Sequence, residues 1–207
     1  MIDAPLPELP PGACAKQDTG DDLAFYAPPR LVTHLDEGAV AALTGHYRTL
    51  LPDGGRVLDL MSSWVSHLPP DRTYAVVGHG MNAEELAANP RLDRWFVQNL
   101  NRDAALPLAD RSFGAALCCV GVQYLQQPLA VFAEVRRVLT PGAPFIVSFS
   151  NRCFPTKAIA IWRALGSDGH AALVRLYLER TGFAPITVEI LANGPGSDPL
   201  IAVTGRA

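Results

Sequence analysis

The sequence predicts one α/β domain built on a seven-stranded, mostly parallel β-sheet with helices on both faces. Short apolar segments of strand character alternate with segments whose apolar residues recur at helical spacing, which is typical of a parallel sheet covered on both sides. The last two apolar segments, 185–191 and 199–205, are separated by a short connection around Gly194-Pro195-Gly196. That connection is too short for a crossover helix, so these two strands must run antiparallel to each other.

Composition supports a folded core and argues against several classes of partner. The chain has 207 residues, 49% of them hydrophobic and 18% charged, which is enough apolar material for one domain. We expect the Pro-rich, acidic residues 1–22 to be a flexible segment and residues 23–207 to form the single domain. The net charge of −3 gives no basic footprint for a nucleic acid.

The chain also lacks the marks of membrane insertion or export. No apolar run approaches the roughly 20 residues that span a bilayer, and the N-terminus has no basic start followed by an apolar run. We therefore expect a cytoplasmic protein with no membrane partner. Cys14, Cys118, Cys119 and Cys153 form no C-x-x-C pair, so no metal site is expected.

The first half of the chain alternates helix and strand. Asp36 is placed to cap a helix over 37–51, which Pro52-Asp53-Gly54-Gly55 ends. The elements predicted after it are a strand over 56–60, a short helical turn over 63–68 closed by Pro69-Pro70, a strand over 73–78, a small helix over 83–88 and a strand over 94–100.

The second half continues the pattern. Pro128 suits the first position of a helix that follows a strand over 112–120 and precedes a strand over 144–150. Helices are predicted near 155–165 and 168–181, ended by Gly166 and Gly182 in the left-handed conformation. The strands over 185–191 and 199–205 then close the sheet.

A ligand site is expected beyond the carboxyl ends of the strands, where ligands bind in open α/β sheets. The residues that follow the first four predicted strands are Asp59 to Ser63, Gly78 to Asn82, Asn99 to Asn101 and Cys119 to Tyr124. Residues 25–34, called the lid segment below, are predicted to fold over this edge.

Three stretches carry a family resemblance. They are VLDLMSSWVS from residue 57, LPLADRSFGAALCCVGVQYL from residue 106 and EVRRVLTPGAPFIVSFSN from residue 134. Over roughly residues 50–150 the chain resembles the class I S-adenosylmethionine-dependent methyltransferases, above all the small-molecule enzymes of the quinone and sterol type (methyltransferase type 11-like). The resemblance implies a Rossmann-like fold, S-adenosyl-L-methionine as cofactor and a small-molecule substrate.

The sequence departs from the family at the cofactor motif. Met61, Ser63 and Val65 stand where the family has three glycines, and Gly80 stands where it has an acid that holds the ribose. Asn82 offers a weaker substitute for that acid. The start of the predicted helical turn at Ser62 or Ser63 would supply free N–H groups for the cofactor's carboxylate, and Asp59 would accept from its ammonium group.

The resemblance places residues by role. The cofactor-binding residues that it implies are Asp59, Leu60, Met61, Ser62, Ser63, Gly80, Met81, Asn82, Leu100, Asn101, Cys119 and Val120. The expected substrate contacts are Tyr26, His34, Gln123, Tyr124 and Asn151. Methyl transfer requires no particular catalytic residue, and the candidates are His34, His67 and Tyr124. Each of these residues also has a structural interpretation, and His79 faces either the site or solvent.

Two functions follow from this sequence. The first is S-adenosylmethionine-dependent methyl transfer to a small molecule. The alternative is a degenerate member that keeps the fold and binds a ligand or a partner without catalysis, which the missing glycines and acids favour. A nucleotide-dependent dehydrogenase would need G-x-G-x-x-G after the first strand, and this sequence lacks it.

Overall fold

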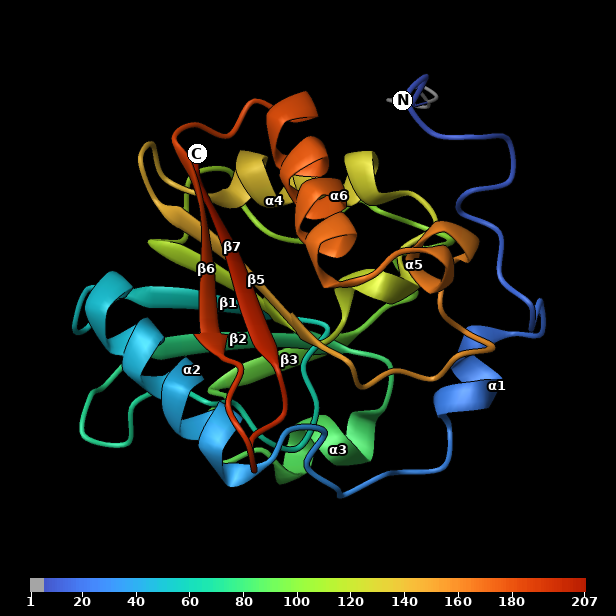
Figure 1. Ribbon diagram of the computed structural model, residues 1–207. Helices are drawn as coiled ribbons and strands as arrows, with labels where there is room; N and C mark the ends of the chain where they lie inside the picture. The colour runs from blue at the N-terminus through green and yellow to red at the C-terminus, as the bar shows by residue number, and fades with distance from the viewer. Residues whose placement is uncertain (1–5) are drawn as a thin grey trace.

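A seven-stranded sheet with the order β3-β2-β1-β4-β5-β7-β6 forms the centre of the computed structural model, which describes residues 6–207 (Figure 1). The strands are β1 (Arg56–Leu60), β2 (Ala75–Gly80), β3 (Arg94–Val97), β4 (Ala115–Cys119), β5 (Pro144–Ser150), β6 (Ile186–Ala192) and β7 (Leu200–Arg206). Strands β1 to β5 are parallel, and β7 runs antiparallel to both β5 and β6. The predicted sheet, including its antiparallel last strand, is confirmed.

Helices cover both faces of the sheet, as predicted. They are α1 (Asp22–Tyr26), α2 (Glu37–Leu50), α3 (Ala83–Ala88), the 3₁₀ turn η1 (Val122–Tyr124), α4 (Pro128–Val138), α5 (Ala160–Ala164) and α6 (Ser167–Arg180). Figure 1 shows α4 and α6 on one face and α2 on the other. Two buried apolar clusters, one on each side of the sheet, follow from this layering.

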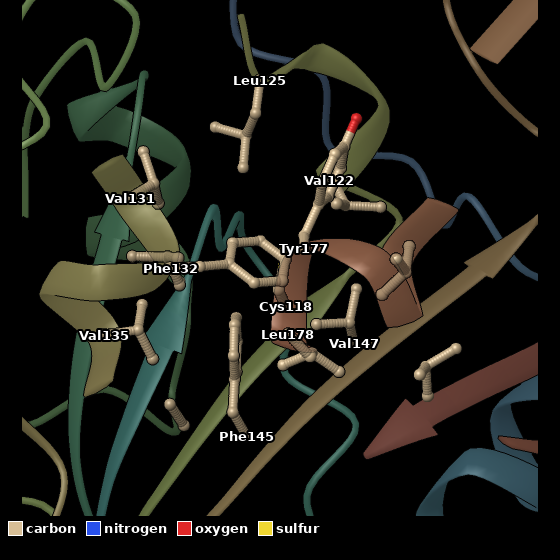
Figure 2. Close-up of a cluster of buried hydrophobic side chains, with 14 of the residues drawn as sticks. Cys118, Val122, Leu125, Val131, Phe132, Val135, Phe145, Val147, Tyr177 and Leu178 are labelled. Carbon is tan, nitrogen blue, oxygen red and sulfur yellow. The ribbon is translucent and has the colours of Figure 1, made fainter. Parts of the chain in front are cut away.

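The larger cluster joins the sheet to α4 and α6 (Figure 2). Phe132 of α4 lies edge-on to Phe145 of β5 and to Tyr177 of α6, with ring centroids 5.0 and 5.6 Å apart. Aromatic pairs in this geometry stabilise a core beyond their buried area. The cluster fixes β4 and β5 beneath the two helices and so holds the strand ends that carry the candidate site.

Several predicted helix ends are confirmed, whereas the helix predicted near 155–165 is limited to α5. The Asp36 carboxylate accepts a hydrogen bond from the Ala39 amide at 2.8 Å and caps α2. Pro128 begins α4, and Gly182 follows α6 with φ +81°. Gly166 is different, because its φ is −94° and it is the N-cap of α6 rather than a left-handed end of α5. The chain turns directly from the short α5 into α6, so no left-handed cap forms there.

The predicted helical turn over 63–68 is wrong, since no helix lies between β1 and β2. Side chains and carbonyls of this loop bind the end of β1 and the region of α3 instead of closing a helical turn. The Ser62 hydroxyl donates to Asp59 at 2.7 Å, and the Ser63 hydroxyl donates to Glu85 at 2.6 Å. The Asn89 amide donates to the Ser63 carbonyl at 2.9 Å. The loop is therefore held open and extended.

Strand boundaries differ from the sequence prediction at β2, β3 and β4. Strand β2 spans Ala75–Gly80 rather than 73–78, β3 ends at Val97 rather than 100, and β4 begins at Ala115 rather than 112. The Asn99 side chain accepts from the Asn101 amide at 2.9 Å, and this local turn ends the strand early. No helix within residues 6–207 has both the length and the apolar character needed to cross a bilayer.

The described part of the N-terminal segment lies against the α5 region. The Ile161 and Ala160 amides donate to the Ala13 and Ala15 carbonyls at 2.9 and 2.8 Å. Fully buried Lys157 lies 3.1 Å from a carboxylate oxygen of Asp18 and 3.1 Å from one of Asp22. Residues 1–5 of the predicted flexible segment lie outside the described residues, and the domain boundary at residue 22 stays a prediction.

Candidate functional site

A cavity of about 520 Å³ opens at the carboxyl ends of the parallel strands, beneath the lid segment. Its volume falls within the range of about 300–1,000 Å³ that is usual for small-molecule sites. The strand order reverses between β1 and β4, and residues after both strands line the cavity. The cavity therefore lies at the topological switch point, where open α/β sheets bind ligands.

Most residues singled out in the sequence line this cavity. They are Tyr26, His34, Asp59, Met61, Ser62, Ser63, His67, Gly80, Met81, Asn82, Leu100, Asn101, Cys119, Val120 and Tyr124. Three others lie elsewhere. Leu60 is buried in the apolar cluster beneath α4, Gln123 is buried and donates to the Val120 carbonyl at 2.8 Å, and Asn151 is exposed.

Asp59 ends β1 at the floor of the cavity, with 5% of its surface exposed. Its Oδ2 atom accepts from the hydroxyls of Ser62 and Ser66 at 2.7 and 2.5 Å. Burial raises the pKa of Asp59, and the two hydroxyls oppose that rise by stabilising the carboxylate. The acid thus organises the loop after β1 as well as facing the cavity.

Two non-glycine residues at the switch point have left-handed backbones. Met61 follows β1 with φ +57°, and Val120 follows β4 with φ +45°. A β-branched residue with this φ is an outlier that the surrounding structure must hold in place. Gly121 makes room for the neighbouring side chain, because a Cβ there would lie 2.8 Å from the Met61 Cβ. Met61 therefore packs against the end of β4 and leaves the cavity open.

His79 is buried rather than solvent-facing. Its Nδ1 atom accepts from the Met61 amide at 3.1 Å, and its Nε2 atom donates to the Gln98 carbonyl at 2.9 Å. Both contacts require the neutral ring with its proton on Nε2. Burial lowers the pKa of His79 to about 4, which agrees with that state. The ring ties the loop after β1 to the end of β3.

The position of the family's ribose-binding acid is closed in this chain. A Cβ on Gly80 would lie 2.6 Å from the Ser62 carbonyl oxygen, so the loop after β1 occupies the space of a side chain. Asn82 is engaged within the protein: its oxygen caps α3, and its nitrogen donates to the Tyr26 and Ala27 carbonyls at 2.9 Å each. Asn82 thereby anchors the lid segment.

Glu85 of α3 was not anticipated from the sequence. One of its oxygens accepts from the Arg30 amide at 2.7 Å, and the other accepts from the Ser63 hydroxyl at 2.6 Å. The available signal was its spacing of three residues from Asn82 at a helix start, which places both residues toward the same edge. Glu85 joins the lid segment to the loop after β1.

Aromatic rings form the wall of the cavity under the lid segment. Tyr26 and Tyr124 have ring centroids 6.5 Å apart, and Phe154 lies 6.2 Å from Tyr26 and 5.8 Å from His34. The Tyr124 hydroxyl accepts from the Phe154 amide at 2.8 Å, and burial raises its pKa to about 12. The lid is also held by Trp64, whose indole N–H donates to the Val32 carbonyl at 2.9 Å.

His34 and His67 reach the same cavity from different segments. Burial lowers the pKa of both rings, and the proximity of His34 lowers the pKa of His67 further. Both imidazoles are therefore neutral at neutral pH, which is the form that accepts a proton.

Residues 62–147 match the family model described as "Methyltransferase domain". No curated protein sequence matches the chain.

Solved structures share the fold at low identity. An S-adenosylmethionine-dependent methyltransferase from Mesorhizobium loti is 20% identical, with a TM-score of 0.57 over 80% of this chain and 98% of that one. A possible histamine N-methyltransferase from Thermotoga maritima is 16% identical, with a TM-score of 0.60 over 82% and 89%. The [4+2]-cyclase SpnF is also 16% identical, with a TM-score of 0.59 over 79% of each chain. These likenesses confirm the Rossmann-like fold.

Proposed function

From the match of residues 62–147 to the methyltransferase domain model and from the shared fold, we propose that this chain is a class I S-adenosylmethionine-dependent methyltransferase that binds S-adenosylmethionine and transfers its methyl group to a small molecule. The observation that supports the proposal most directly is the cavity at the switch point, with buried Asp59 at its floor. Under this proposal the protein's partner is a small molecule, and neither a nucleic acid nor a membrane is involved. A cytoplasmic location and a domain over 23–207 belong to the same proposal.

The cavity fits the cofactor's chemistry in part. Asp59 offers a carboxylate for an ammonium group, and Met81 and Leu100 offer apolar surface for a base. Asn101 contributes less than the sequence indicated, because its amide nitrogen donates to Asp22 and to the Tyr124 carbonyl at 3.1 and 3.0 Å. The closed position at Gly80 means that the ribose is held without the family's acid.

When bound, the cofactor supplies an electrophilic methyl group. The protein's task is then to align the acceptor, exclude water and remove a proton where the acceptor carries one. The aromatic wall and the lid segment cover part of the cavity and would limit the access of water to a bound ligand. Neutral His34 or His67 accepts the proton from an O–H or N–H acceptor. Tyr124 serves as a wall, since its hydroxyl already accepts from the Phe154 amide.

The alternative is a binding module without catalysis. The observation that favours it is the loop after β1, which departs from the family's glycine motif. This loop contains no helix, and its Ser62 carbonyl fills the space beside Gly80. The likeness to a [4+2]-cyclase shows only that this fold is not restricted to one activity.

Calorimetric titration with S-adenosylmethionine and with S-adenosylhomocysteine tests the proposal. We expect saturable binding of one molecule and competition between the two. Asp59→Asn removes the carboxylate and is expected to weaken binding by about 10-fold or more. Asp53→Asn, at an exposed turn residue, is the matched control. A protein that binds neither molecule would exclude cofactor-dependent methyl transfer and leave the binding module.

A further inference from the structure

Arg30 is a cation of the cavity wall without a carboxylate partner among residues 6–207. Its guanidinium donates to two carbonyls of its own segment, those of Phe25 at 3.0 Å and Pro28 at 3.4 Å. The other two basic residues of the same wall are paired: Lys16 with Asp22 at 2.7 Å, and Arg152 with Asp198 at 2.9 Å. An arginine has five N–H donors, so Arg30 retains free ones.

Three aromatic rings surround this guanidinium. Its central carbon lies 4.8 Å from the ring centroid of Phe25, 5.4 Å from that of Phe154 and 5.9 Å from that of Tyr26. Cation–π contacts of this kind stabilise the charged side chain in place, and the N–H groups that the Phe25 and Pro28 carbonyls do not use remain available for a carboxylate. The geometry therefore prepares Arg30 for a planar anion.

Nearby Glu85 does not neutralise the guanidinium directly. Its two oxygens accept from the Arg30 backbone amide and from the Ser63 hydroxyl, at 2.7 and 2.6 Å. These contacts hold the backbone of Arg30 in place and leave its side chain without an anionic partner in the described residues. A half-buried cation of this kind gains most from an anion supplied by a ligand.

We propose that Arg30 is the carboxylate-binding residue of this cavity. The inference rests on the proposed function and deepens it. The loop after β1 offers no helix N-terminus for an anion, because no helix forms between β1 and β2. The carboxylate belongs either to the amino-acid end of the cofactor or to an acidic aromatic substrate seated against the ring wall. The chemistry of recognition is the same for both.

A pair of ligands isolates the cofactor's carboxylate. S-adenosylhomocysteine carries the amino-acid end, and 5′-methylthioadenosine has the same nucleoside without it. The measured quantity is the ratio of their dissociation constants for the wild type, Arg30→Gln and Arg152→Gln. We expect Arg30→Gln to raise the dissociation constant of S-adenosylhomocysteine about 10- to 100-fold and to change that of 5′-methylthioadenosine little. Arg152→Gln, at the paired arginine of the same wall, should leave the ratio unchanged.

A second pair tests an acidic substrate. Benzoate and benzamide have the same ring and differ in charge, and each is titrated into the protein saturated with S-adenosylhomocysteine. If the wild type binds benzoate more tightly than benzamide and Arg30→Gln loses this preference, Arg30 binds the carboxylate of the substrate. Arg30→Lys, which keeps the charge but loses the planar fork, should retain part of either preference.

The outcomes separate the two proposals. If the wild type binds S-adenosylhomocysteine and Arg30→Gln changes neither ratio, the role of Arg30 is overturned while cofactor binding stands. If the variant merely loosens the lid segment, both ligands of a pair should lose affinity equally. This result also counts against the inference. If the wild type binds neither nucleoside, the proposed function fails, and the benzoate pair, titrated into the protein alone, decides the role of Arg30.

Discussion

The Nδ1 atom of His79 accepts a hydrogen bond from the backbone amide of Met61 at 3.1 Å. This contact joins the end of β2 to the left-handed residue after β1, and the Gln98 carbonyl accepts from the opposite side of the same ring. One neutral imidazole thus connects the ends of three neighbouring strands.

Acid should weaken the fold through His79. Burial lowers its pKa to about 4 in the folded protein, whereas an unfolded histidine has its usual value near 6.5. Between these values the unfolded chain binds the proton and the folded chain does not, so stability is full above about pH 6.5 and falls toward pH 4. The loss is on the order of 3 kcal/mol. Urea unfolding of the wild type and His79→Gln across this range measures it, and an equal pH dependence in both proteins would contradict the assignment.

Gly80→Ala should destabilise the protein. The new Cβ would meet the Ser62 carbonyl at 2.6 Å, and this contact is with backbone that cannot rotate away. Overpacking of this kind costs about 1–3 kcal/mol. Gly45→Ala in α2 has open space and should be neutral or stabilising by up to about 1 kcal/mol. Denaturant midpoints compare the two variants. Gly80→Asp should likewise lose stability and should not strengthen cofactor binding.

Val120 offers a test of backbone strain. An alanine normally stabilises a chain relative to glycine, because glycine loses more entropy on folding. At φ +45° the order should reverse, with Val120→Gly more stable than Val120→Ala by about 1 kcal/mol. The difference between the two variants removes the effect of the lost methyl groups. Thermal unfolding of both proteins checks the order, and a more stable alanine variant would show that this backbone is unstrained.

Lys157 should be critical for the attachment of the N-terminal segment. It is fully buried between Asp18 and Asp22 and donates to the Gly20 carbonyl at 2.9 Å. Lys157→Met removes the cation that Asp18 and Asp22 share, while Asp22 keeps Lys16 at 2.7 Å, so the expected cost is that of lost charged hydrogen bonds, about 1.5–3 kcal/mol. Arg175→Met breaks an exposed pair on α6 and should cost about 0.5 kcal/mol or less. Hydrogen exchange over residues 13–22 should rise in the first variant alone.

The sheet was predictable because its signals are local and repeated. Alternating apolar segments, the Pro128 helix start and the short final connection each indicate their element without tertiary information. The loop after β1 was not predictable in the same way. Ser62 and Ser63 suggest a helix start, but their hydroxyls bind Asp59 and Glu85, and Glu85 lies 22 residues from Ser63. Contacts between distant segments decide such a loop.

The same distinction between local signals and contacts of distant segments applies to the residues of the candidate site. Strand ends placed Asp59, Gly80 and Val120 at one edge of the sheet, whereas Arg30, Glu85 and Phe154 were missed. Nothing in the spacing of Arg30 shows that three rings surround it, because Phe154 lies 124 positions away in the chain. An unpaired cation becomes visible only when all its neighbours are known.

The two contacts of the Glu85 carboxylate have a consequence for how ligands enter and leave the cavity. One oxygen holds a segment 55 residues away in sequence, and the other holds a loop 22 residues away. The loop after β1 also holds the lid segment through Trp64 and the Val32 carbonyl, so movement of one segment is coupled to movement of the other. Entry and departure of a guest molecule are therefore expected to follow one cooperative opening, with a single rate, rather than two independent loop movements.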